Sequence, residues 1–187
     1  MNRNALSSIP RIVMVLLLVA ATATISVQLR GGPSSVAANV SNQLALGVQA
    51  QRSGDYQSAI AHYLAVQRLE PRSPIPLFDA GDAEEFAGDL RRARQYYDQC
   101  LALDATYVPA LYNEAVMAQT SNSSGAIALY RRVIAQSKPG SAQWILIAKS
   151  HYNLGLLLEK RGQGLEGRAQ VALGIKLDPG LAPHTQR

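Results

Sequence analysis

Cysteine is nearly absent from this chain, since Cys100 is its only one among 187 residues. An internal disulfide and a cluster of cysteine metal ligands are therefore excluded. A bacterial lipid anchor is excluded as well, because no cysteine stands directly after the apolar run near the amino terminus. Cys100 occupies a position that takes small, buried residues in the repeating pattern described below. We interpret it as a packing residue and not as a nucleophile.

Histidines and catalytic motifs are also scarce. His62, His151 and His184 are scattered, without a second ligand at metal-binding spacing, so no metal site is expected. The sequence has no phosphate-binding glycine loop, nucleophile elbow or isolated carboxylate pair, and we expect neither enzyme activity nor a cofactor. Alanine and leucine dominate the 48% of hydrophobic residues, which favours closely packed helices.

The net charge of +5 is concentrated at one end of the chain. Arg3, Arg11 and Arg30 flank the amino-terminal apolar run and carry three of the five excess charges. Elsewhere basic and acidic residues are interleaved, which is typical of a solvated mixed surface and not of a stripe that follows phosphates. We therefore expect no nucleic-acid partner.

A run without charged residues extends from residue 12 to residue 29, after a basic stretch at residues 1–11. As a helix it would be about 27 Å long, just enough for a bilayer core of roughly 30 Å. It predicts a transmembrane helix or signal anchor. Because positive charges precede the run, the amino terminus should stay cytoplasmic and the rest of the protein should be extracytoplasmic, as a single-pass membrane protein.

A cleaved signal peptide is the alternative for the same segment. Small residues at 21–23 and 35–37 would suit cleavage, which would release a secreted or periplasmic protein. We favour the uncleaved anchor, because residues 24–29 extend the apolar run beyond what a signal peptide needs. Residues 30–39 begin with glycine, proline and serine and predict a flexible linker.

The rest of the chain repeats itself at an interval of 34 residues. The aligned pairs are Gly47 with Gly81, Gly54 with Gly88, Asp55 with Asp89, Ala59 with Ala93, Tyr63 with Tyr97, and Leu69 with Leu103. A third copy follows with one residue missing from a turn. A fourth copy follows an insertion at residues 141–147, which we expect to lengthen the next helix by two turns.

These positions resemble those of the tetratricopeptide repeat (TPR) family, and residues 54–63 resemble its signature between two helices. The resemblance covers about three quarters of the chain. It implies an all-α fold, a right-handed TPR superhelix (α-solenoid) of about four helix-turn-helix repeats. The expected TPR domain spans residues 40–181, with repeats at 40–73, 74–107, 108–140 and 148–181 and a tail at 182–187.

Small residues are expected where the two helices of a repeat cross. The expected pairs are Gly47 with Ala59, Gly81 with Ala93, Ala115 with Ala126, and Gly155 with Gly167. Gly54 and Gly88 should end their helices in a left-handed conformation, and the aspartates that follow should cap the next helices. Gly167 and Gly174 should weaken the last helix by about 1 kcal/mol each relative to alanine.

The resemblance implies that the first helices of the repeats line a concave peptide-binding groove. The expected groove residues are Leu44, Val48, Phe78, Asp79, Asp82, Tyr112, Asn113, Val116, Tyr152, Asn153 and Leu156. An apolar and aromatic stripe suits an extended peptide, whose backbone could bind Asn113 and Asn153, two amides that folding should not need. Asp79, Asp82 and Glu85 share one helix face, with Glu84 beside them, and favour a basic partner segment.

The predicted function is that of a membrane-tethered adaptor or scaffold that binds an extended peptide segment of a client protein. By resemblance, its role would lie in envelope protein assembly or maturation. The alternative is a self-associating structural protein, a homo-oligomer formed through an exposed carboxy-terminal end around Val171 and Ile175, together with Trp144.

Overall fold

The computed structural model describes residues 33–136, 138 and 142–182, and within these ranges the chain forms helices and no strand. The described residues contain eight α-helices, which make four hairpins. Hairpin 1 is α2 (Pro33–Arg52) and α3 (Tyr56–Leu69), hairpin 2 is α4 (Ile75–Ala87) and α5 (Leu90–Leu103), hairpin 3 is α6 (Val108–Ala118) and α7 (Ser123–Ala135), and hairpin 4 is α8 (Trp144–Lys160) and α9 (Gly164–Leu177), followed by the short 3-10 helix η1 (Pro179–Leu181). The predicted all-α class is confirmed.

The chain divides into two units between residues 42 and 43. Of the first unit, the structure describes residues 33–42, which are the beginning of α2. The linker predicted over residues 30–39 is therefore wrong from residue 33 onward. Proline is favoured at the first helical position, and the two alanines that follow shortly after favour helix, so the segment continues α2.

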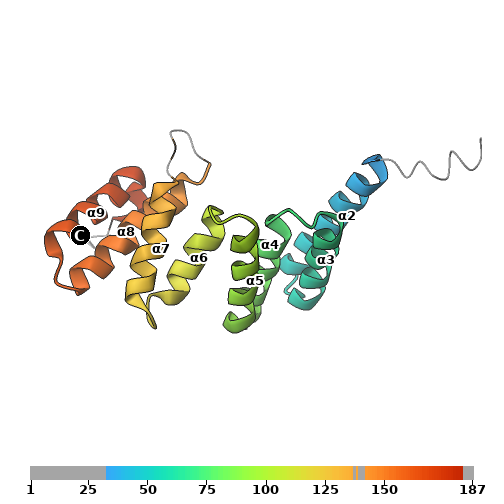
Figure 1. Cartoon of the computed structure of the whole chain (residues 1–187), viewed down its shortest axis with the longest axis horizontal. Coiled ribbons are helices and arrows are strands. Elements are labelled where there is room, and N and C mark those ends of the chain that lie inside the picture. The colour runs from blue at the N-terminus through green and yellow to red at the C-terminus, as the bar shows by residue number, and fades with distance from the viewer. Residues whose placement is uncertain (1–32, 137, 139–141, 183–187) are drawn as a thin grey trace, which may run out of the picture. The chain divides into compact units, whose positions relative to one another are not determined.

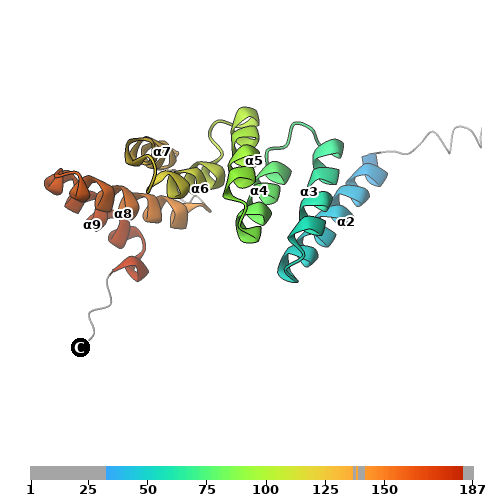
Figure 2. The same cartoon turned by 90° about the horizontal axis from the view of Figure 1, so that it is seen from below.

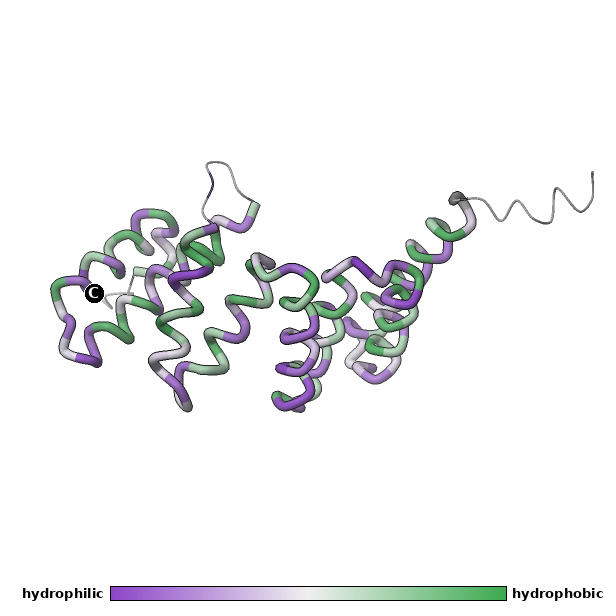
Figure 3. Tube along the Cα trace, in the orientation of Figure 1, coloured by the Kyte–Doolittle hydropathy of each residue, from purple (hydrophilic) through white to green (hydrophobic). Residues whose placement is uncertain are grey.

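The predicted transmembrane segment, residues 12–29, lies outside the described residues, as do residues 1–11. Among the described helices, none has a stretch long and apolar enough to cross a membrane. Figure 3 shows why, because polar and apolar positions alternate along these helices. Polar residues therefore interrupt the apolar stretches of these helices.

The first two hairpins close with the same turn. Gly54 and Gly88 have φ angles of 81° and 87°, in the left-handed region that glycine adopts without a Cβ penalty. The carboxylates of Asp55 and Asp89 then accept hydrogen bonds from the backbone N–H three residues further on, at 3.1 and 2.9 Å. Both the left-handed glycines and the aspartate caps were predicted from the sequence, and both are confirmed.

In hairpins 1 and 2, a glycine on the first helix lies against a tyrosine ring on the second. A Cβ added to Gly47 would lie 2.6 Å from Cε1 of Tyr63, and one added to Gly81 would lie 2.6 Å from Cε1 of Tyr97. Ala93 contributes only its backbone oxygen, 3.2 Å from that second position. We predicted that these glycines lie against Ala59 and Ala93. The nearest neighbours are instead the rings of Tyr63 and Tyr97, one turn later on the second helices.

Hairpin 4 brings the backbones of its two helices together. A Cβ on Gly155 would lie 2.6 Å from the backbone oxygen of Gly167, which confirms that predicted pair. A Cβ on Gly174 would lie 2.8 Å from the backbone oxygen of Ala148. Alanine at Gly167 or Gly174 would therefore clash with α8, so the expected gain in helix stability from alanine does not apply at these positions.

The insertion before hairpin 4 lengthens α8 by one turn, so the predicted two turns are wrong. The helix begins at Trp144 with Gln143 as its N-cap, and the backbone N–H groups of Leu146 and Ile147 bond to the Gln143 carbonyl. Residues 142 and 143 form a turn ahead of the helix and cannot contribute to it.

Buried side chains form a row of clusters and not a single core. One cluster joins Ala59, Ile60 and Tyr63 of hairpin 1 to Ala80 and Ala83 of α4. Equivalent clusters join hairpin 2 to α6 and hairpin 3 to α8. Hairpins 2, 3 and 4 follow one another in both Figure 1 and Figure 2. Each hairpin thus packs mainly on its neighbours, which is the architecture of an α-solenoid.

Candidate peptide-binding face

Four expected groove residues occupy equivalent positions on successive first helices and are half-buried, and we call them the first level: Leu44, Phe78, Tyr112 and Tyr152. The Phe78 ring lies 5.8 Å from that of Tyr97 and 5.5 Å from that of Tyr107. The Tyr112 ring lies 6.0 Å from that of Tyr130. These rings stabilise the packing of the hairpins and leave only part of their surface for a partner.

The second level lies one turn later on the same helices and consists of Val48, Asp82, Val116 and Leu156. Its apolar members are exposed, by 40% for Val48, 37% for Val116 and 45% for Leu156. Asp82 is half-buried at the equivalent position of α4. The second level therefore offers a partner apolar side chains on three hairpins, with one carboxylate among them.

Tyrosine hydroxyls on the second helices tie each hairpin to the next. The Tyr63 hydroxyl donates to Oε1 of Gln51 at 2.7 Å, and Nε2 of Gln51 donates to Oδ2 of Asp82 at 2.8 Å. The Tyr97 hydroxyl donates to Oε2 of Glu85 and accepts from Nδ2 of Asn113, both at 2.9 Å.

The Tyr130 hydroxyl accepts from Nε2 of Gln119 and, at 3.2 Å, from Nδ2 of Asn153. Burial raises the pKa of Tyr130 to about 12 and raises the pKa of Tyr97 as well, so both hydroxyls stay protonated. Asn113 and Asn153 thus hold neighbouring hairpins together. These two hydrogen bonds argue against the prediction that folding does not need the two amides, because side chains on a first helix also reach the preceding hairpin.

The four acidic residues of α4 differ in their surroundings. Glu84 is only 2% exposed, and its carboxylate lies 3.5 Å from Arg92, so it does not face a partner as predicted. Glu85 accepts the Tyr97 hydroxyl, and Asp82 accepts the Gln51 amide. The pKa of Asp79 is raised to about 6, mainly by burial and to a smaller extent by the negative charge of the neighbouring Asp82.

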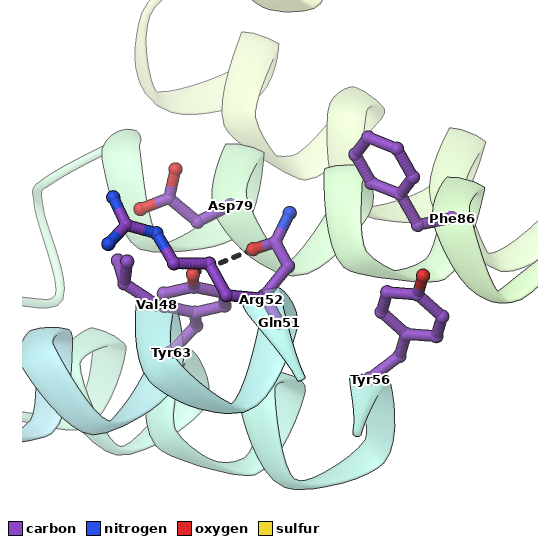
Figure 4. A pocket seen from close by; sticks show the side chains of 7 residues that line it. All are labelled: Val48, Gln51, Arg52, Tyr56, Tyr63, Asp79 and Phe86. Carbon is purple, nitrogen blue, oxygen red and sulfur yellow. Dashed lines mark hydrogen bonds between the residues drawn. The ribbon is translucent and has the colours of Figure 1, made fainter. Parts of the chain in front are cut away.

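A cleft with a volume of about 430 Å³ opens between hairpin 1 and α4. It is lined by Val48, Gln51, Arg52, Tyr56, Tyr63, Asp79 and Phe86. Figure 4 shows Asp79 at one end of the cleft, Tyr56 and Phe86 at the other, and the Arg52 side chain extending toward the Asp79 end. Of the predicted groove residues, only Val48 and Asp79 line this cleft.

The sequence analysis missed Gln51, Arg52, Tyr56 and Phe86. One signal was available for the first of them, because Gln51 aligns with Glu85 and Gln119 at the same 34-residue interval. All three of these side chains bind a tyrosine hydroxyl. No repeat signal marks Phe86, since arginine and threonine stand at its aligned positions.

Residues 77–107, which run from α4 through α5 to the loop before α6, match the sequence model of the tetratricopeptide repeat. The chain thus contains a tetratricopeptide repeat. The match covers the second of its four hairpins, where the left-handed Gly88, the Asp89 cap and the contact between Gly81 and Tyr97 have been described.

Solved structures with the same tetratricopeptide fold include two forms of MamA. One crystal structure of MamA is 21% identical, with a TM-score of 0.62, and the match covers 76% of this chain and 80% of that chain. MamA from Desulfovibrio magneticus RS-1 is 23% identical, with a TM-score of 0.61 and coverage of 75% and 76%. At these identities the likeness shows the fold alone. The search of curated proteins gave no match.

In the described part of the chain, the cysteine and two of the histidines are engaged in packing and hydrogen bonding. Burial, with Asp104 and Asp79 nearby, raises the pKa of Cys100 to about 12, which makes its thiol a weak nucleophile. His62 and His151 each lie within hydrogen-bond distance of a glutamine on the neighbouring helix, at 2.7 and 2.6 Å. Within the described ranges, no three histidine, cysteine or acidic residues are grouped as metal ligands would be.

Proposed function

We propose that this tetratricopeptide protein is a membrane-tethered adaptor that binds an extended segment of a client protein along the second level of its first helices. The observation that carries the proposal is the exposure of Val48, Val116 and Leu156 at one repeated position on three hairpins. Tetratricopeptide proteins generally act as scaffolds for protein interactions. An extended segment can place alternate side chains against such regularly spaced apolar positions.

The tether in this proposal is the uncharged run at residues 12–29. With the basic residues on its amino-terminal side, the hairpins would be extracytoplasmic. The clients would then be envelope proteins during assembly or maturation, held near the membrane in an extended form. Cleavage as a signal peptide would instead give a secreted or periplasmic adaptor with the same binding face.

Site-specific photo-crosslinking in native membranes tests the adaptor proposal. A photoreactive residue at Val116 should capture a defined protein, whereas the same residue at the exposed Gln95 of α5 should not. Serine at Val48 and Leu156 should reduce capture from position 116, because the apolar contacts on both sides are lost. Equal capture from both positions would argue against the second level as the binding face.

Self-association is the second candidate function, and exposed leucines on α9 favour it. Val171 and Ile175, the residues predicted to form an exposed end, are half-buried, and Cγ2 of Val171 packs against Gly155. The large apolar side chains that α9 does expose are Leu165, Leu173 and Leu177. Of these, Leu165 has 83% of its surface exposed, so the predicted end shifts to a different face of the same helix.

A further inference from the structure

We propose that the cleft between hairpin 1 and α4 takes an arginine side chain of the bound segment beside Asp79, and an apolar side chain two residues away against Tyr56 and Phe86. The proposal rests on the proposed function, because it specifies which residues the client segment presents. The cleft would then prefer client segments in which an arginine and an apolar residue lie two positions apart in an extended chain.

Asp79 is the acidic residue of α4 that lacks a partner in the described part of the chain. Glu84 pairs with Arg92, Glu85 accepts the Tyr97 hydroxyl, and Asp82 accepts the Gln51 amide. Asp79 has neither a hydrogen bond nor an ion pair among the described residues, although it is half-buried and lines the cleft. A carboxylate in such surroundings is stabilised by an added cation.

The neighbouring charges also favour a cation. Asp82 stands one turn further along α4 and raises the pKa of Asp79. Arg52 faces the same end of the cleft, but it is exposed, so water screens its charge more than it screens the half-buried carboxylates. The cleft therefore has Asp79 in its lining and Asp82 beside it, bonded to the lining residue Gln51, against one solvated arginine. A guanidinium from a partner would offset this excess of negative charge.

Arginine fits this end better than lysine because its planar group can donate to two acceptors at once. Oδ2 of Asp82 already accepts one hydrogen bond from Gln51, and a carboxylate has room for more. A guanidinium beside Asp79 could therefore reach Asp82 as well, which lies three residues away on the same face of the helix.

The other end of the cleft is aromatic. The rings of Tyr56 and Phe86 stack at 6.1 Å with an interplanar angle of 13°, and Phe86 is 63% exposed. Phe86 lies seven residues after Asp79 on α4, which is about 10 Å along the helix. Side chains two residues apart on an extended chain point the same way and are about 7 Å apart. The long side chain of arginine can span the difference between this spacing and the distance from Asp79 to Phe86.

Fluorescence anisotropy with labelled peptides and the full chain in neutral detergent tests the proposal. The probe is Leu-Ala-Arg-Ala-Leu, which has a leucine two residues from the arginine on either side and so suits both directions of binding. One matched peptide carries citrulline, the neutral analogue of arginine, and another carries glutamate. The arginine peptide should bind about tenfold tighter than the citrulline peptide at neutral pH.

Three variants assign that difference to the cleft. Asp79→Asn should bring the two affinities within about twofold of each other, and Phe86→Ala should weaken both peptides. Arg52→Ala should tighten the arginine peptide about threefold, because a competing cation is removed. Lowering the pH to about 5 should weaken the arginine peptide in the wild type and not in Asp79→Asn. Unchanged circular dichroism and a cooperative thermal melt would show that each variant is folded.

Equal binding of the arginine and citrulline peptides would overturn this inference. If Val116→Ser then weakened both, the adaptor proposal would still stand. Tighter binding of the glutamate peptide would overturn the inference as well and would identify Arg52 as the recognising residue. A further matched peptide carries lysine in place of arginine, and binding as tight as that of the arginine peptide would overturn the choice of arginine. Failure of all the peptides to bind would reject the cleft, and the crosslinking at Val116 would decide on the adaptor separately.

Discussion

The side-chain amide of Asn113 on α6 donates a hydrogen bond to the hydroxyl of Tyr97 on α5, over 2.9 Å and across the boundary between two hairpins. Asn113→Ala should therefore lower the free energy of unfolding by about 1 kcal/mol, because the hydroxyl of the buried Tyr97 loses its donor. Urea denaturation followed by circular dichroism measures this loss.

A double-mutant cycle with Tyr97→Phe is the control for this hydrogen bond. In the Tyr97→Phe background, Asn113→Ala should cost less than about 0.5 kcal/mol, since the acceptor is already absent. The same loss in both backgrounds would show that Asn113 acts through other contacts.

Ala93→Leu should destabilise the protein by about 1–3 kcal/mol, because Ala93 is fully buried beside the contact between Gly81 and Tyr97. The matched surface change is Arg91→Leu, which should alter stability by less than about 0.5 kcal/mol. Arg92→Leu is unsuitable as a control because Arg92 pairs with the buried Glu84. Thermal melts of both variants compare these positions, and equal small losses would contradict the assigned repeat register.

Asp79 should make the stability of the protein depend on pH. Its pKa is raised from 3.8 to about 6 in the folded chain, so that chain binds more protons than the unfolded chain between these values. Stability should therefore fall as the pH rises through this window. Asp79→Asn removes the effect and should be more stable than the wild type by about 1 kcal/mol near pH 8, a value reduced for screening by water. Urea titrations across the pH range should show the two proteins converging below pH 4.

Leu165 and Leu173 test the self-association alternative. Serine at both positions should shift the full chain in neutral detergent toward the monomer in sedimentation velocity, with little change in melting because both side chains are exposed. The matched change, Val116→Ser, should leave sedimentation unaltered. A monomeric wild type would remove this alternative.

A reporter enzyme fused after residue 187 tests the proposed location. It should be active only outside the cytoplasm, and the mature chain should stay with membranes after an alkaline wash, because residues 12–29 would remain as a hydrophobic anchor. Sequencing of the mature amino terminus provides the control. A chain that begins after residue 23 or residue 37 would establish signal-peptide cleavage.

The sequence predicted well those features that depend on residues close together in the chain. The turns at Gly54 and Gly88 and the caps at Asp55 and Asp89 depend on a few neighbouring residues, so the repeat pattern was sufficient for them. The length of α8 was less predictable, because the inserted residues 141–147 have no counterpart in the other repeats of the sequence.

The candidate site was harder to predict because its contacts cross from one hairpin to the next. Asn113 aligns with Asp79, yet Asn113 binds a tyrosine whereas Asp79 lines a cleft without a partner among the described residues. Glu84 aligns with Ala50 and Ala118, which are small residues, and this alignment could have indicated its burial. The direction of each side chain still depends on how neighbouring helices pack, which the repeat interval does not specify.

Val171 stands on α9 where the preceding second helices carry Tyr63, Tyr97 and Tyr130. A further hairpin docking there, from any molecule, would meet methyl groups instead of a hydroxyl that fixes its position. Such an interface would depend on shape complementarity and the exclusion of water. It would tolerate sliding and rotation, which the hydrogen-bonded interfaces between successive hairpins resist. Hydrogen bonds from tyrosine hydroxyls therefore fix how neighbouring hairpins pack within the array. The face of α9 at Val171 has no such bond to define a partner's orientation.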